Sequence, residues 1–270
     1  LKCILALSPH SEFARAILLK RFLASTRLKG HNAGNMLLTM LSQYTGSFSE
    51  GIQAFSEILD VTGTILPVSL DKATLVAELT DGSRIYGEKA IDIPRGTQRE
   101  KIVDVFLVPH HSDTISVYPQ VIDAIKKADF IVIGPGDVFT SVAPNLVVPG
   151  VKEAIRKTKA RIIYVVNIMT KFGETHQFKS ADFVQTLENF IGRKLDWVIY
   201  NDKKPGSAIL KKYLKQKSEF VVPGNDDRWK KCRIYKGDLL DISGGVVRHN
   251  PQKLAAAVKK ICRKSAAKGT

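Results

Sequence analysis

Small polar residues follow two apolar stretches of this sequence, at the points where the stretches end. The first, FIVI at 130–133, runs into a Gly-Pro-Gly turn and a polar loop, and the second, at 161–166, runs into NIMTKFGET. Backbone N–H groups beside glycine and the side chains of Asn, Ser and Thr can donate hydrogen bonds to phosphate or carbonyl oxygens. The two loops therefore predict a site for a phosphorylated ligand. Its candidate contacts here are Gly134, Gly136, Asp137, Thr140, Ser141, Asn145, Asn167, Thr170, Gly173, Glu174 and Thr175.

Alternating strands and helices should bring these loops together. The hydrophobic periodicity predicts strands at 102–108, 130–133, 161–166 and 197–200, with helices between them at 119–127, 147–157 and 181–191. Such alternation implies right-handed crossovers and a parallel sheet. Ligands of open parallel sheets bind outside the carboxyl ends of the strands, which is where both loops begin. We expect an α/β fold with a mostly parallel sheet.

The first third of the chain has signals for the starts and ends of helices, followed by a β-rich segment. A helix at 12–23 is expected, then the loop KGHNAGN at 29–35, then helices at 36–44 and 47–59. Alternating β-branched residues, with Asp81-Gly82 as a hairpin turn, predict a small antiparallel β insertion at about 61–93. At the other end, Asn250-Pro251 is expected to cap a final helix.

Composition narrows the class of protein. At 270 residues and 44% hydrophobic, the chain is expected to form a single domain over 1–270. No apolar run approaches the roughly 18 residues of a membrane span. Cys3, Cys232 and Cys262 lack metal-ligand spacing and cannot all pair, so we expect no metal site, no disulfide framework and a cytoplasmic location.

The positive charge is concentrated near the carboxyl terminus. Residues 203–270 hold 18 of the 41 Lys and Arg residues but only 5 of the 26 Asp and Glu residues. A solvated surface explains this best, and attraction to an anionic ligand, nucleic acid or anionic membrane is the alternative. No RNA-binding signature accompanies the aromatic residues, so a nucleic-acid partner is not favoured.

The sequence begins LKCILALSPH, which lacks Met and resembles the middle of a helix. We expect a missing N-terminal segment. The Gly-rich phosphate loop of a doubly wound sheet would lie there, since no G-x-G-x-x-G occurs in the residues given.

Several motifs together resemble those of one protein family. They are KGHNAGN, DGSRIYGE, ADFIVIGPGDVFTSVAPNLVVPG, VVNIMTKFGET, YND and VVRHNPQKLA. The chain resembles the gluconeogenesis factors, also described as CofD-like proteins after 2-phospho-L-lactate transferase. This resemblance implies a three-layer Rossmann-like domain that binds a nucleotide diphosphate conjugate, typically a UDP-sugar. It also implies a homodimer and a link to cell shape and peptidoglycan precursor supply.

Carried over by motif, the resemblance adds His31, Asn32 and Asn35 to the ligand contacts. Each could instead be structural, since His and Asn are common at helix starts. Two positions depart from the family pattern, which usually has Ser at Asp137 and Tyr at Phe139. An acidic side chain beside a diphosphate is unfavourable without a cation between them. Asp137 would therefore point away, help to hold Mg²⁺, or contact ligand hydroxyl groups.

Two kinds of function fit these features. The chain could be a regulatory protein that binds a nucleotide sugar without chemistry, or a transferase that moves a phospho-acyl group from a nucleotide diphosphate conjugate to a deazaflavin acceptor. A transferase would need Mg²⁺ or basic groups at the diphosphate, and Glu174 would be its general base. Asp182 is the other acidic candidate, with a capping role as the alternative. A basic structural or nucleic-acid-associated protein is the third possibility.

Overall fold

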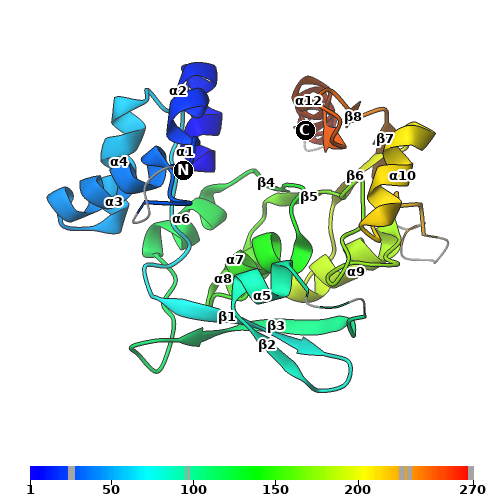
Figure 1. Ribbon diagram of the computed structural model, residues 1–270, viewed down its shortest axis with the longest axis horizontal. Coiled ribbons are helices and arrows are strands. Elements are labelled where there is room, and N and C mark those ends of the chain that lie inside the picture. The colour runs from blue at the N-terminus through cyan, green and yellow to red at the C-terminus, as the bar shows by residue number, and fades with distance from the viewer. Residues whose placement is uncertain (24–27, 95, 97, 225–228, 230–232, 267–270) are drawn as a thin grey trace. The chain divides into compact units, whose positions relative to one another are not determined.

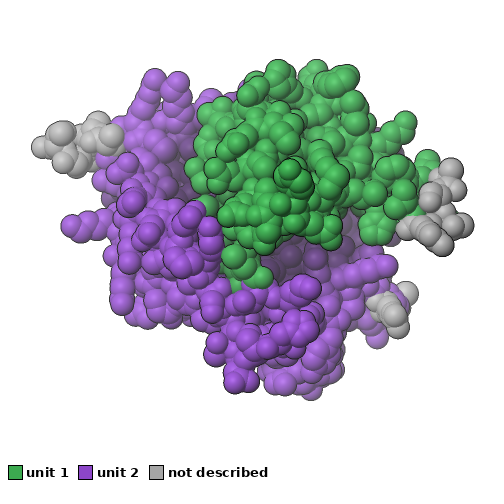
Figure 2. All heavy atoms as spheres, turned by 90° about the vertical axis from the view of Figure 1, so that its left-hand side faces the viewer, with its two compact units in different colours: residues 1–70 green, residues 71–270 purple. Residues whose placement is uncertain are grey.

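The computed structural model describes residues 1–23, 28–94, 96, 98–224, 229 and 233–266, which leaves Cys232 outside the described residues. The chain divides into two compact units, Leu1–Leu70 and Asp71–Thr270, which Figure 2 distinguishes by colour. The prediction of a single domain over 1–270 stays a prediction.

The first unit is helical. It consists of α1 (Lys2–Leu7), α2 (Ser11–Leu18), α3 (Ala33–Thr45) and α4 (Phe48–Ile58). Ile4, Leu38, Ile52 and Phe55 form its buried centre. The expected helix at 12–23 ends early, at Leu18, and Arg21 beyond it forms a β-bridge with Asn32. Asn32 then caps α3, and its side chain accepts a hydrogen bond from the Asn35 backbone N–H at 2.8 Å.

The second unit begins with an antiparallel sheet of order β2-β1-β3. Its strands are β1 (Ala73–Leu79), β2 (Arg84–Tyr86) and β3 (Ile102–Pro109). Gly82 adopts φ 80° in the predicted hairpin turn. The antiparallel insertion is confirmed with corrected bounds, since 61–69 form no strand and 88–92 form the short helix α5 (Glu88–Asp92).

The assignment of 102–108 to the parallel sheet was wrong. β3 pairs antiparallel with β1 over its whole length, from Ala73 opposite Pro109 to Leu79 opposite Ile102. Alternation of strands and helices does not reveal this pairing, because the partner strand precedes β2 and α5 in the chain.

A four-stranded parallel sheet of order β4-β5-β6-β7 forms the centre of the second unit. Its strands are β4 (Phe130–Ile133), β5 (Arg161–Val165), β6 (Trp197–Asn201) and β7 (Ile234–Gly237), as Figure 1 shows. The first three lie where the hydrophobic runs predicted them. Successive residues point to opposite faces, and Ile162, Ile163, Tyr164 and Val165 are all buried, so both faces must be covered.

Helices cover both faces of this sheet, which confirms the three-layer α/β prediction (Figure 1). On one face α12 (Pro251–Ala266) packs against Ile163, Val165 and Ile199. On the other lie α8 (Val151–Lys157) and α9 (Ser180–Ile191), with α6 (Pro119–Lys127) packed against α8. The predicted cap of α12 is confirmed, because Asn250 Oδ1 accepts from the Lys253 N–H at 3.0 Å.

The remaining elements were not predicted. A π-helix, η1 (Val138–Val142), and the short α7 (Ala143–Leu146) precede α8, which therefore begins at 151 rather than 147. Helix α10 (Ser207–Lys215) and the paired strands β8 (Leu240–Asp241) and β9 (Arg248–His249) lie after β6. Within the described ranges, no helix has the length and apolar character that a bilayer span would require.

Candidate functional site

The two predicted loops meet at the carboxyl ends of β4 and β5. Asn167, directly after the buried Val166, donates from Nδ2 to the backbone oxygen of Gly136 at 3.0 Å. Its Oδ1 is buried without a hydrogen-bond partner. The first loop is thus tied to the end of the second strand through a side-chain amide. This confirms that the loops lie together, as the parallel sheet predicted.

The first loop turns into a π-helix immediately after Gly136. The Asp137 carbonyl accepts from the N–H groups of Ser141 and Val142, at 2.8 and 3.1 Å. Asn145 donates from Nδ2 to the Ser141 carbonyl at 2.8 Å. Ser141 and Asn145 are exposed, whereas Thr140 is 6% exposed. Single-turn π-helices concentrate at functional sites, which agrees with the position of this one beside the loop.

Glu174 fastens the second loop to this π-helix. Its side chain is fully buried. Oε1 accepts from Thr140 Oγ1 at 2.9 Å, and Oε2 accepts from the Phe139 backbone N–H at 3.2 Å. Burial raises the pKa of Glu174, and the nearby charge of Lys171 only partly offsets the effect. Both oxygens are engaged within the protein.

Lys171 lies among three carboxylates. Its Nζ bonds to Asp92, to Asp137 Oδ2 at 2.7 Å and to Glu174 Oε1 at 3.0 Å. Burial alone would lower the pKa of Lys171, but the bonds to Asp137 and Asp92 and the charge of Glu174 outweigh it and raise the pKa. Lys171 is therefore charged at neutral pH. It places a positive charge beside Asp137, whose role towards a ligand stays a prediction.

Two cavities, of about 410 and 700 Å³, share Asp137, Met169 and Tyr213 in their walls and together form what we call the crevice. The smaller is bounded by the Gly-Pro-Gly turn, Asn167, and residues 247–254 before and within α12. The larger is bounded by Asp92, residues 169–172 and the end of α10. Both volumes lie in the range of small-molecule sites.

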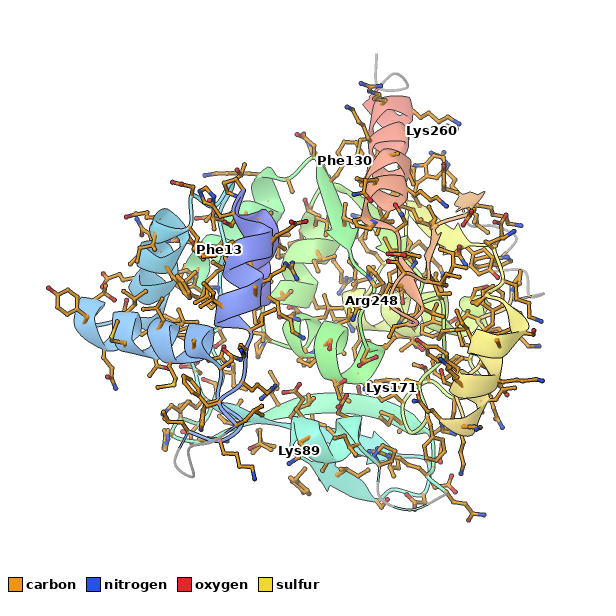
Figure 3. The ribbon with its side chains drawn as sticks, turned by 45° about the horizontal axis from the view of Figure 1, so that its top comes forward. Phe13, Lys89, Phe130, Lys171, Arg248 and Lys260 are labelled. Atoms are coloured by element: carbon orange, nitrogen blue, oxygen red, sulfur yellow. The ribbon has the colours of Figure 1, made fainter. Side chains whose placement is uncertain are left out.

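Arg248 and His249 line the smaller cavity, and Figure 3 labels Arg248 and Lys171. The Arg248 side chain is exposed. His249 makes a hydrogen bond with the Val166 backbone, while its Nε2 is buried without a partner. Burial lowers the pKa of His249 to about 4, so the ring is neutral at physiological pH.

The predicted contacts of this unit fall into three groups. Gly136, Asp137, Asn167 and Thr170 line the crevice. Gly134, Ser141 and Asn145 are exposed on the first loop. The buried remainder holds the loops in place: Thr140, Gly173, Glu174 and Thr175.

Thr170 has a structural role besides lining the crevice, and Gly173 has a structural role alone. The Thr170 backbone N–H donates to the Glu219 carbonyl at 2.8 Å, and the Thr170 carbonyl accepts from Ser218 Oγ. Thr170 Oγ1 accepts from the Glu219 N–H at 2.9 Å. Gly173 has φ 83°, and a Cβ there would lie 2.7 Å from Pro94 Cγ. Asp182 accepts from the Lys179 N–H at 2.7 Å and so has the capping role.

His31, Asn32 and Asn35 belong to the first unit. His31 and Asn35 are exposed, and Asn32 is buried as the cap of α3. Their contact with a ligand stays a prediction.

Sequence reasoning missed several residues of the crevice. Arg248 and His249 lie in the motif VVRHN, which was a usable signal, and Lys171 lies within the second loop. Asp92 carried no signal, because its segment was expected to be a strand. Tyr213, which accepts from the Val247 N–H at 2.8 Å, comes from a helix that was not predicted.

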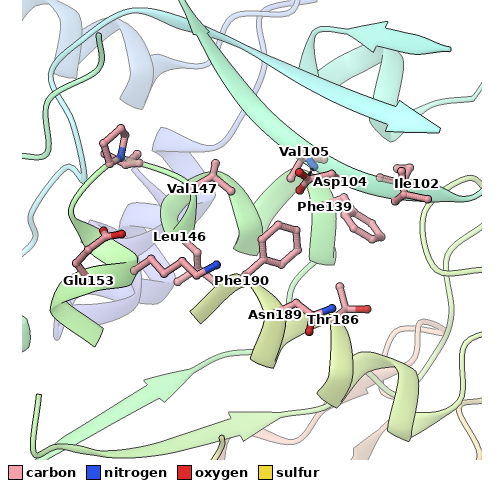
Figure 4. Close-up of a pocket in the computed structure, with 14 residues that line it drawn as sticks. Ile102, Asp104, Val105, Phe139, Leu146, Val147, Glu153, Thr186, Asn189 and Phe190 are labelled. Atoms are coloured by element: carbon pink, nitrogen blue, oxygen red, sulfur yellow. Dashed lines mark hydrogen bonds between the residues drawn. The ribbon is translucent and has the colours of Figure 1, made fainter. Parts of the chain in front are cut away.

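A separate cavity of about 540 Å³ lies between β3, α7, α8 and α9 (Figure 4). Phe139, Leu146, Val148 and Phe190 are among its apolar lining residues. None of the predicted ligand contacts lines it.

Asp92, Asp137 and Glu174 place carboxylate oxygens within 4.8 Å of one another, a spacing that could suit a cation. The Lys171 ammonium already bonds to all three. A divalent ion would have to displace it, so this group does not fit Mg²⁺ as it stands.

Known proteins share this fold and more than a third of this sequence. A family model described as 2-phospho-L-lactate transferase CofD matches residues 1–240. A protein of Aquifex aeolicus named "Putative gluconeogenesis factor" is 39% identical over 96% of this chain and 78% of its own length. The "Gluconeogenesis factor" of Halalkalibacterium halodurans is 35% identical over 94% of this chain and 78% of its own length.

A crystal structure of a protein from Bacillus halodurans matches with a TM-score of 0.86 and 33% identity, over 94% of this chain and 80% of that one. Sequence and structure thus agree with the resemblance carried by the two loop motifs. The chain belongs to the CofD-like family of gluconeogenesis factors.

Proposed function

We propose that this protein binds a nucleotide diphosphate sugar, with UDP as the nucleotide, and acts as a regulator rather than as an enzyme. In the cell it would report the level of this ligand and so connect metabolism with cell shape and envelope precursor supply. Family membership supports the class of ligand. The physical support comes from the crevice.

The observation that carries the proposal is the junction of the two loops at the ends of β4 and β5. Backbone of the Gly-Pro-Gly turn borders the crevice there, since Pro135 and Gly136 line the smaller cavity. Gly134 beside them is exposed, with nothing within 4 Å of the position of a Cβ. Arg248 lines the adjoining wall and supplies a cation suited to phosphate. The crevice thus offers both kinds of group that diphosphates require.

The hydrogen bonds of Glu174 within the protein favour a ligand-binding function over a transferase reaction. A general base needs a lone pair within reach of the acceptor proton. Glu174 is fully buried and accepts from the Phe139 N–H and Thr140 Oγ1 while pairing with Lys171. We therefore assign Glu174 to the support of the loops. The transferase is the alternative that the experiment must separate.

Isothermal titration calorimetry with UDP-glucose and UDP-N-acetylglucosamine tests the proposal, with UMP and free glucose as controls. We expect both conjugates to bind with 1:1 stoichiometry. Mass spectrometry of small molecules that co-purify with the protein provides a second measurement. Failure of both conjugates to bind would refute the proposal, and recovery of a deazaflavin would favour the transferase.

A further inference from the structure

We propose that the end of the crevice bounded by Asp92 and Asp137 selects against a carboxylate on the ligand, so that a neutral or amino sugar binds better than the matching uronic acid. This inference rests on the proposed function, because it concerns the sugar of a nucleotide diphosphate conjugate. It adds a basis for choosing among such conjugates.

The larger cavity presents acidic groups to its contents. Asp92 and Asp137 both line it, and each side chain is 38% exposed. Lys171, which lies between them, is 28% exposed, and Glu174 is hidden beneath. A ligand group that enters this cavity therefore meets two half-exposed carboxylates that share one ammonium.

Neighbouring cations do not reverse this balance. The three carboxylates face Lys171 directly, and Arg99 lies near enough to Glu174 for their charges to interact. Arg99 donates from Nη1 to the Ile91 carbonyl at 2.6 Å and is not among the residues that line the larger cavity. Lys217 holds its ammonium over the Phe172 ring, 4.5 Å from the ring centre. The groups that line the cavity remain acidic on balance.

The smaller cavity is balanced in charge rather than acidic. Arg248 is its charged wall residue besides the shared Asp137, and His249 is neutral. Its other walls include Ile168, Leu254 and the Tyr213 ring, which suit a nucleobase.

A conjugate that satisfies both ends has only one favourable orientation. Its base and diphosphate lie toward Arg248 and the Gly-Pro-Gly turn, and its sugar lies toward Asp92 and Asp137. Hydroxyl groups and amines donate to carboxylates, whereas a sugar carboxylate would be repelled by them. The acidic residue at Asp137 thus contacts the sugar and not the phosphates.

UDP-glucose and UDP-glucuronate provide a matched pair, because they differ only in the oxidation state of sugar carbon 6. We expect the protein to bind UDP-glucuronate about tenfold more weakly, a difference of about 1.4 kcal/mol. Calorimetry at a single low salt concentration measures both, since screening by salt would reduce the difference.

Three variants test the origin of this selectivity. Asp137→Asn and Asp92→Asn should each shrink the ratio of the two affinities, because each removes one negative charge. Lys171→Gln should enlarge the ratio, because it leaves the carboxylates uncompensated. Asp123→Asn changes an exposed carboxylate on α6, outside the crevice, and should leave the ratio as it is. Circular dichroism and melting temperature establish that each variant is folded.

The outcomes separate this inference from the proposed function. If neither conjugate binds, the proposed function fails. If both bind with equal affinity, or if Asp137→Asn and Lys171→Gln change the ratio in the same direction, the sugar does not lie against these carboxylates and the inference is overturned.

Discussion

Thr140 Oγ1 donates a hydrogen bond of 2.9 Å to Glu174 Oε1, so that the π-helix after β4 is fastened to the loop after β5. Neither side chain is accessible to a ligand from solvent. The contact shows how one loop motif stabilises the other. Glu174, the candidate general base of the sequence analysis, holds the backbone and side chains of the π-helix in place. Its energetic weight can be measured.

Thr140→Val should lower the free energy of unfolding by about 1 to 3 kcal/mol, because it leaves a buried carboxylate oxygen with one donor fewer at constant side-chain volume. Urea unfolding followed by circular dichroism checks this. Thr39→Val is the control, since Thr39 bonds only to the backbone of α3 at an exposed position, and its effect should stay within about 0.5 kcal/mol. Equal losses in both variants would show that the Thr140 contact has no special weight.

Gly134→Val should weaken binding of UDP-glucose at least about tenfold while leaving the melting temperature unchanged. The position is exposed with free space around it, so only a ligand close to the backbone would meet the new side chain. Gly136→Val is a poorer test, because its Cβ would lie 3.3 Å from Val142 Cγ2 and would disturb the π-helix. Unchanged affinity in folded Gly134→Val would exclude the turn from the site.

Asn167→Ala and Thr175→Ala should have opposite consequences. Asn167 lines the crevice and fixes the Gly136 carbonyl, so its loss should cost about 1 to 3 kcal/mol of UDP-glucose binding with little change in stability. Thr175 is 2% exposed and accepts from the Lys171 N–H at 3.0 Å, so its loss should reduce stability by a similar amount. Calorimetry measures the binding of both variants and thermal melting their stability. A loss of stability in Asn167→Ala together with a loss of binding in Thr175→Ala would contradict these roles.

His249 should make stability depend on pH. The unfolded chain takes up a proton at the ordinary value near 6.5, whereas the folded ring resists protonation until about pH 4. The free energy of unfolding should therefore fall, by on the order of 3 kcal/mol, as pH is lowered through this interval. Above it the contribution is fully present.

Urea unfolding of the wild-type protein and of His249→Gln at several pH values measures the contribution of His249 to this pH dependence. In His249→Gln, the free energy of unfolding should fall less steeply between pH 6.5 and 4. The same substitution at the exposed His111 is the matched control. Identical slopes in the wild-type protein and His249→Gln would mean that the ring is not shielded in solution.

The elements that a sequence can reveal are those that depend on local signals. FIVI at 130–133 and the helix from Pro119 to Lys127 appear at their expected bounds, because an apolar run and a Pro at the first helical position act locally. The pairing of β3 with β1 did not follow from such signals. Nor did η1, since a π-turn differs from an α-turn by one residue in the hydrogen-bond spacing rather than by composition.

The site divides in the same way. Asn167 and Gly136, which line the crevice, were predicted from residues that neighbour them in sequence. Asp92 was missed, because it contacts Lys171 across 79 residues and from a five-residue helix that looked like a strand. The carboxylate of Asp92, which shares the Lys171 ammonium with Asp137, therefore could not be placed there before the chain was folded.

Helix α5 packs against η1, and its last residue, Asp92, bonds to Lys171. One wall of the crevice thus consists of residues that precede β3 in the sequence, and the other walls consist of residues that follow β4. Contacts so distant in sequence close large loops and form late during folding. Occupancy of the crevice would consequently report that both parts of the second unit have docked, so ligand affinity measures the completeness of the fold as well as the chemistry of the site.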